Sequence, residues 1–240
     1  MAKNPEKGKC VHCLKDTVER TWDHVFPKAW YPETTPEKLE KWQIPSCLEC
    51  NQRLGKLEND LIGRVALTLD AKNPASKGLA EKALRAINPG EARDDGDAAA
   101  REARAKKLLN EMFKGEQIKS KNVVPGLGER WGRAVEEQVA VRIPDESFPV
   151  ITEKIVRGLA FREEGVFIDS PQKIECYLAN EEGLDDVKKL LDDQGREFKR
   201  EPGLVIRRAT LDDGDLYEIT FWNQFKTYAI VSKSETPAGG

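Results

Sequence analysis

Two short cysteine motifs, Cys10-Val-His-Cys13 and Cys47-Leu-Glu-Cys50, are separated by 33 residues. Each C-x2-C motif places two thiolates in one tight turn, and two such motifs complete the tetrahedral four-sulfur site that structural Zn²⁺ prefers. A site of this kind has no vacant coordination position, so its role is in folding. Structural zinc can contribute on the order of 10 kcal/mol to a small polar unit that buries little apolar surface. We therefore predict that Cys10, Cys13, Cys47 and Cys50 bind structural Zn²⁺.

Other roles for these side chains are less favoured. Two disulfides could also use the four thiols, but nothing in the sequence indicates an oxidising compartment, and thiol redox chemistry is less favoured still. His12 could replace one thiolate as a ligand, although four cysteines already satisfy the metal, so we expect it to be exposed. Cys176 lies in an apparent strand, where a small buried apolar side chain is a better interpretation than a nucleophile.

A second motif is formed by residues that lie between the two cysteine motifs and directly after the second one. The segment Thr21-Trp-Asp-His-Val-Phe-Pro-Lys28 stands between them, and Asn51-Gln-Arg-Leu-Gly-Lys-Leu-Glu-Asn59 follows the second motif directly. An Asp-His pair after a β-rich stretch, followed by Cys-x2-Cys-Asn at the start of a helix with a lysine, resembles the HNH nucleases, also called ββα-metal nucleases. The resemblance is to the zinc-containing type and covers about residues 8 to 62, a quarter of the chain.

The resemblance implies hydrolysis of phosphodiester bonds in nucleic acid. His24 would be the general base, because an ordinary imidazole accepts a proton near neutral pH. Asp23 and Asn51 would be ligands of a catalytic Mg²⁺ or Mn²⁺, cations that prefer oxygen ligands and take up charge on the phosphate. Neighbours in a regular strand point to opposite faces, so the backbone must bend for Asp23 and His24 to share a site.

The helix expected to begin near Asn51 carries further candidates. Arg53 and Lys56 lie on its first turns and could bind a phosphate oxygen of the substrate, or they could be solvated surface charges. Glu58 and Asn59 lie about two turns along from Asn51, on roughly the same helical face, and could contact a water molecule on the metal.

The sequence also departs from the HNH pattern. Many members carry an additional Asn shortly before the second cysteine motif, which orients the catalytic histidine; here that stretch reads Glu40-Lys41-Trp42-Gln43, and Gln43 could substitute. The last motif residue, often a histidine, is Asn51. These changes bear on the efficiency of the site more than on its type. The aromatic residues of this segment are predicted to form its core rather than to stack on bases: Trp22, Phe26, Trp30 and Trp42.

The chain is expected to be α+β. We predict an HNH unit with zinc motifs over 1–65, helices over 66–125, an α+β domain with an antiparallel sheet over 126–234, and a tail over 235–240, with the domain boundary in a Pro- and Gly-containing stretch near residue 125. Apolar periodicity predicts helices over Ala98–Phe113 and Val150–Arg162, and Asp185–Leu191 is expected to be a short helix between strands. The predicted strands are Lys173–Leu178, Gly203–Leu211, Leu216–Trp222 and Thr227–Ser232, with turns at 212–215 and 223–226.

The charge distribution permits a nucleic-acid partner without requiring one. The net charge is −3, but residues 1–60 carry ten positive and ten negative side chains, 61–134 fifteen and ten, and 135–240 fourteen and twenty-two. DNA is favoured over RNA as the partner, and the acidic C-terminal half is a candidate surface for a homo-oligomer or a protein partner. The sequence shows no membrane span and no secretory signal, so a cytoplasmic protein is expected.

Three functions are compatible with these observations. The first is a Mg²⁺- or Mn²⁺-dependent endonuclease, whose C-terminal half could recognise a target, form a dimer or restrain the nuclease, as in a defence or restriction system. The second is a zinc-stapled nucleic-acid-binding module with a degenerate nuclease site. The third is a structural zinc domain serving an acidic partner-binding domain. The motif favours the first.

Overall fold

The computed structural model describes residues 4–16, 18–70, 72–118, 134–178 and 184–232. The helices are α1 (Leu48–Val65), α2 (Leu79–Ile87), α3 (Asp95–Asn110), α4 (Ser147–Glu164) and α5 (Asp185–Gln194). The strands are β1 (Arg20–His24), β2 (Gln43–Cys47), β3 (Met112–Lys114), β4 (Val139–Val141), β5 (Lys173–Tyr177), β6 (Arg196–Arg200), β7 (Leu204–Leu211), β8 (Gly214–Phe221) and β9 (Phe225–Ser232). The predicted boundary near residue 125, its linker and the tail lie outside the described residues.

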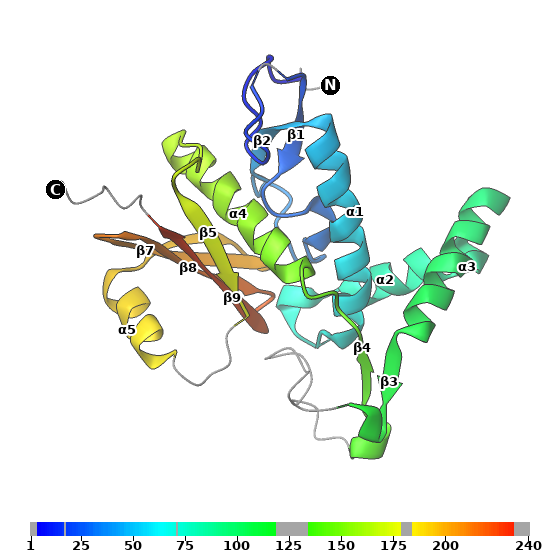
Figure 1. Cartoon of the computed structure of the whole chain (residues 1–240). Coiled ribbons are helices and arrows are strands. Elements are labelled where there is room, and N and C mark those ends of the chain that lie inside the picture. Colours follow the sequence, from blue (N-terminus) through cyan, green and yellow to red (C-terminus); the bar gives the residue numbers. More distant parts are fainter. Residues whose placement is uncertain (1–3, 17, 71, 119–133, 179–183, 233–240) are drawn as a thin grey trace.

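The N-terminal segment forms a β-hairpin followed directly by a helix. Strands β1 and β2 are antiparallel, in a continuous register from Arg20 opposite Cys47 to His24 opposite Gln43. Helix α1 begins at Leu48, slightly before the start expected near Asn51, because Cys47 caps it through a sulfur that accepts the Cys50 N–H. This ββα order places the second cysteine motif at the junction between strand and helix (Figure 1).

Helix α1 lies beside the hairpin, and α2 and α3 follow it and extend to one side of the molecule (Figure 1). Asp94 begins α3 as its N-cap by accepting the Asp97 N–H. The helix ends at Asn110, so the prediction of a helix through Phe113 was wrong at its end. Phe113 lies instead in β3, opposite Ala140 of β4. Local apolar periodicity could not reveal this pairing with a strand distant in sequence.

The C-terminal part contains a five-stranded antiparallel sheet in the order β5-β9-β8-β7-β6, which confirms the predicted α+β class. The four predicted strands and the helices α4 and α5 are present, whereas β6, with its charged sequence, was not predicted. The turn expected at 223–226 is shorter, because Phe225 already pairs with Phe221, and Trp222 and Asn223 have positive φ. Helix α5 packs against Ala209, Leu216 and Tyr228 of the sheet through Leu191.

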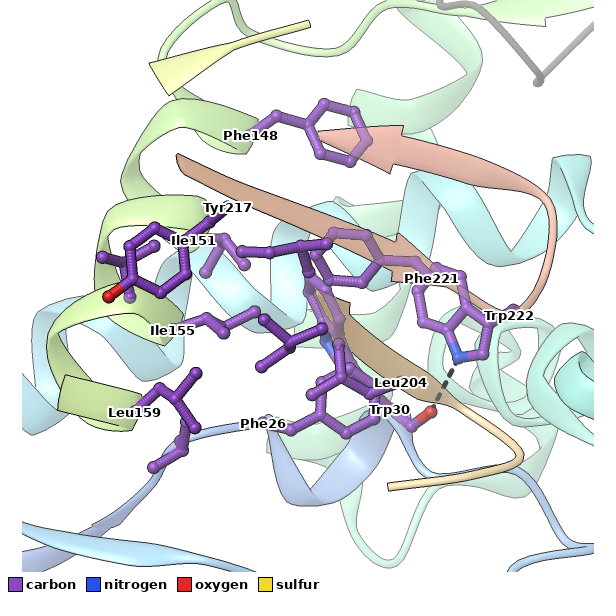
Figure 2. Close-up of a cluster of buried hydrophobic side chains, with 14 of the residues drawn as sticks. Phe26, Trp30, Phe148, Ile151, Ile155, Leu159, Leu204, Tyr217, Phe221 and Trp222 are labelled. Atoms are coloured by element: carbon purple, nitrogen blue, oxygen red, sulfur yellow. Dashed lines mark hydrogen bonds between the residues drawn. The ribbon is translucent and has the colours of Figure 1, made fainter. Parts of the chain in front are cut away.

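One hydrophobic core joins the hairpin unit, α4 and the sheet (Figure 2). Phe26 and Trp30 pack against Phe221 and Trp222, and the Trp222 indole N–H donates to the backbone carbonyl of Trp30 at 2.9 Å. Of the aromatic residues predicted to be core, Phe26, Trp30 and Trp42 are buried, but Trp22 is 37% exposed, so that prediction was wrong for Trp22. The hairpin unit is therefore held against the sheet by a shared core.

Within the described ranges, no helix combines the length and the apolar character needed to span a bilayer.

Candidate functional site

The four cysteines of the two motifs lie in one cluster. Their sulfur atoms are all within 4.8 Å of one another, and Sγ of Cys13 is 3.8 Å from Sγ of Cys47. A tetrahedron with Zn–S bonds of about 2.3 Å has edges of about 3.8 Å, whereas a disulfide requires sulfurs about 2.0 Å apart. The donor set and spacing suit a structural Zn²⁺, so this cluster could hold one, and all four thiols are unbridged.

Backbone N–H groups donate hydrogen bonds to sulfur atoms of this cluster. The Cys47 N–H donates to Sγ of Cys10 at 3.3 Å, and the Cys50 N–H donates to Sγ of Cys47 at 3.4 Å. Burial raises the pKa of the Cys10 thiol, but the hydrogen bonds from the backbones of Cys13 and Cys47 outweigh it and lower the pKa to about 6. The thiolate form that binds metal is thus favoured at Cys10, whereas burial raises the pKa of the Cys47 and Cys50 thiols. The cluster ties the loop before β1 to the start of α1.

Asp23 lies on the buried face of the hairpin. The His12 ring donates from Nε2 to its Oδ2 at 2.9 Å, and the Lys154 ammonium of α4 donates to its Oδ1 at 3.0 Å. Lys154 also forms an ion pair with Glu58 of α1. Burial alone would raise the pKa of Asp23, yet the His12 hydrogen bond and the charge of Lys154 hold it below its usual value. His12, expected to be exposed, is buried in this contact, so that expectation was wrong.

His24 lies on the opposite, outward face. The register of β1 and β2 continues through His24, so the expected backbone bend is not found and the strand pleat separates His24 from Asp23. The Gln43 amide lies 3.3 Å from Nε2 of His24, in the place where the sequence suggested a substitute for the missing Asn. Partial burial, followed by the charges of Lys154, Lys28 and Lys41, lowers the pKa of His24, although Asp23 opposes this. The imidazole is therefore neutral near pH 7.

The remaining predicted residues of α1 are distributed over the helix. The Asn51 amide donates to Oγ1 of Thr21 at 2.9 Å and to the Trp22 carbonyl at 3.2 Å, so it fastens α1 to β1. Arg53, Lys56 and Asn59 are exposed. Their roles toward phosphate or a metal-bound water stay predictions.

Glu58, by contrast, faces the buried side of the hairpin. Burial raises its pKa, although the neighbouring Lys154 opposes that shift.

Both carboxylate oxygens of Asp23 have hydrogen-bond partners, His12 and Lys154, and Asp23 is only 5% exposed. This arrangement does not fit a hydrated Mg²⁺ or Mn²⁺ at Asp23, because the cation would have to displace the Lys154 ammonium.

Sequence reasoning missed Lys154 altogether. The residue belongs to the helix predicted over Val150–Arg162, where it follows the buried Ile151 and precedes the buried Ile155. A lysine within the apolar stripe of a helix is itself a signal, because a buried ammonium needs a carboxylate partner. Cys176, predicted to be a buried apolar side chain, is half-buried against the core, and burial raises its pKa to about 12, which keeps the thiol protonated.

Comparisons of the chain with protein-family models, with curated proteins and with solved structures find no match. The resemblance to HNH nucleases therefore depends on the motif residues themselves.

Proposed function

We propose that the protein is an HNH-type endonuclease that hydrolyses phosphodiester bonds in DNA and requires Mg²⁺ or Mn²⁺. The observation that supports this best is the position of His24, which lies on the outward face of a ββα unit that also carries the cysteine cluster, with Gln43 against its ring. A role in defence or restriction, and a C-terminal sheet that recognises a target or a partner, are further parts of the proposal.

The chemistry proposed for His24 is proton abstraction from the attacking water. Its lowered pKa keeps the ring neutral and able to accept a proton at physiological pH. The Gln43 amide nitrogen donates to Nε2 of His24 at 3.3 Å, so the ring carries its proton on Nδ1 and Nε2 is its basic nitrogen. A divalent cation would need Asp23 to be released from Lys154, and it would then supply stabilisation of the negative charge on the phosphate.

His24→Ala is expected to lower the rate of DNA cleavage by about 10²- to 10⁴-fold, the usual contribution of a general base. The protein should remain folded, because His24 lies outside the hydrophobic core. Cleavage of an end-labelled DNA duplex under single-turnover conditions measures the rate, and circular dichroism with zinc content verifies the fold. Lys106→Ala, at an exposed position of α3 to which no role is assigned, provides a comparison for general surface effects. Undiminished cleavage by His24→Ala would rule out this role.

The cleavage rate should also show a specific pH dependence. Because the folded-state pKa of His24 lies below the ordinary value of 6.5, the base stays neutral until the pH falls below that value. We expect a constant contribution from His24 near pH 7 and a decline only at pH below about 6.5. A rate profile of the wild-type protein, compared with the residual activity of His24→Ala, tests this. A decline already centred above pH 6.5 would contradict the assignment.

A second candidate function is favoured by the buried contacts of Asp23. If the Asp23 carboxylate remains paired with Lys154 in every state, no catalytic cation binds there, and the protein is a zinc-stapled nucleic-acid-binding module. That function predicts DNA binding without cleavage in Mg²⁺ or Mn²⁺. The cleavage assay on zinc-loaded wild-type protein separates the two.

A further inference from the structure

A cleft with a volume of about 550 Å³ lies between the β-hairpin and the C-terminal end of α4. Its lining includes Arg20 and Trp22 of β1, Gln43 and Pro45 of β2, and Phe161 and Arg162 of α4. The hairpin residues of the cleft lie on the outward face. Trp22 comes two residues before His24 in β1, so their side chains point to the same face, and Pro45 lies opposite Trp22. The cleft thus begins beside the Gln43 side chain that contacts His24.

The aromatic and charged groups of this cleft match a nucleotide. Trp22 is 37% exposed, whereas the other three tryptophans in the part of the chain that the structure describes, Trp30, Trp42 and Trp222, are buried. An exposed indole offers a stacking surface to any base, and base stacking contributes strongly to the binding of single strands. Arg20, Arg162 and the acidic Glu6 line the cleft, Glu40 pairs with Arg162 at its edge, and a guanidinium group is a common ligand of phosphate.

The two arginines have different roles. The Arg20 guanidinium donates to the backbone carbonyls of Glu6 and Lys9, so it is occupied in holding the N-terminal segment. The Arg162 guanidinium donates to the Glu40 carboxylate at 2.6 Å, and the two side chains are 38% and 62% exposed. An exposed ion pair contributes little free energy, so a phosphate can take the place of the Glu40 carboxylate.

We propose that this cleft binds one strand of nucleic acid, with a base stacked on Trp22 and the adjoining phosphate held by Arg162. The proposal rests on the function proposed above, because it gives the strand a path past His24. It also assigns substrate binding to Arg162, which the sequence did not suggest, and to Trp22, for which the sequence favoured a core role over base stacking.

The test measures binding of a fluorescein-labelled oligothymidylate by fluorescence anisotropy. The parent protein is the zinc-loaded, full-length His24→Ala variant without added divalent cation or chelator, so that cleavage does not interfere. Trp22→Ala is expected to raise Kd by about ten-fold or more, and Trp22→Phe should retain most of the affinity because it keeps an aromatic face. Tyr177→Ala, at an exposed aromatic of β5, is the matched control and should bind like the parent.

Arg162→Gln and Glu40→Gln test the phosphate contact in opposite directions. Arg162→Gln should weaken binding and reduce the slope of log K against log salt by about 0.7, the change expected for one phosphate contact to a single strand. Glu40→Gln should tighten binding, because it removes the carboxylate that competes for Arg162.

Failure of this inference can be told apart from failure of the proposed function. Equal affinity of parent and Trp22→Ala, or no binding by the parent, overturns the cleft, and wild-type cleavage of DNA would still uphold the nuclease. Loss of affinity in Trp22→Ala, with a wild-type protein that binds but does not cut, upholds the cleft and refutes the nuclease.

Discussion

Cys50→Ser is expected to lower the free energy of unfolding by at least about 5 kcal/mol. Structural zinc contributes on the order of 10 kcal/mol in small domains, which is comparable to the total stability of many proteins. Cys50 lies in the first turn of α1, and its cluster joins that helix to the loop before β1. Phe26 and Trp30 pack directly on the sheet. Loss of the order that the cysteine cluster gives the hairpin unit should therefore also expose core residues of the sheet to solvent.

Denaturant unfolding, followed by near-ultraviolet circular dichroism, measures this loss, and elemental analysis gives the zinc content. Cys176→Ser is the matched control, because that cysteine lies on β5 outside the cluster and should change stability much less. Removal of zinc by a strong chelator should reproduce the effect in the wild-type protein. A wild-type protein that contains no metal, with Cys50→Ser equally stable, would contradict the zinc site.

Lys154→Met is expected to destabilise the protein by about 3 to 5 kcal/mol, the usual result of removing one partner of a buried ion pair. Methionine fills a similar volume but leaves the Asp23 and Glu58 carboxylates buried without their cation. Lys106→Met is the matched control: Lys106 pairs with Glu102 on the exposed face of α3, and such a pair contributes little. Unfolding of both variants under the same conditions gives the comparison.

The same variant tests whether Lys154 keeps a divalent cation from Asp23. Added Mn²⁺ should recover part of the stability of Lys154→Met, because a cation that binds the folded state stabilises it. It should recover little in the double variant Asp23→Asn/Lys154→Met, which lacks the carboxylate. A Lys154→Met protein as stable as the wild type would show that Lys154 is not needed to stabilise the buried Asp23 and Glu58 carboxylates. Recovery that is equal in both variants would place the Mn²⁺ elsewhere.

The features that the sequence predicted correctly are mostly local. The spacing of Cys10 to Cys13 and of Cys47 to Cys50 places two thiols in each of two turns that could hold a metal, and the register of one short hairpin brings Gln43 to His24. Strands of the C-terminal sheet were predicted because β-forming side chains cluster in each of them. In these cases, the responsible interactions lie within one motif or one pair of neighbouring strands.

The surroundings of Asp23 could not be predicted in this way. Its partner Lys154 is 131 positions away in the chain, and the two meet only because α4 crosses the buried face of the hairpin. Gly158, one helical turn later, allows this close approach, since a side chain there would collide with Val25. The exposure of Trp22 has a related cause: the covering elements pack on the other face, where Asp23 and Ile44 lie. Long-range packing thus decided which predicted site residues face solvent.

The central claim is that His24 makes this zinc-stapled unit a nuclease. It is tested most directly by incubating zinc-loaded wild-type protein and His24→Ala with supercoiled plasmid DNA in Mg²⁺ or Mn²⁺. We predict nicked and linear DNA from the wild type, none without the divalent cation, and little or none from His24→Ala. Intact plasmid with folded, zinc-loaded wild-type protein in both cations, or equal cleavage by His24→Ala, would contradict the claim.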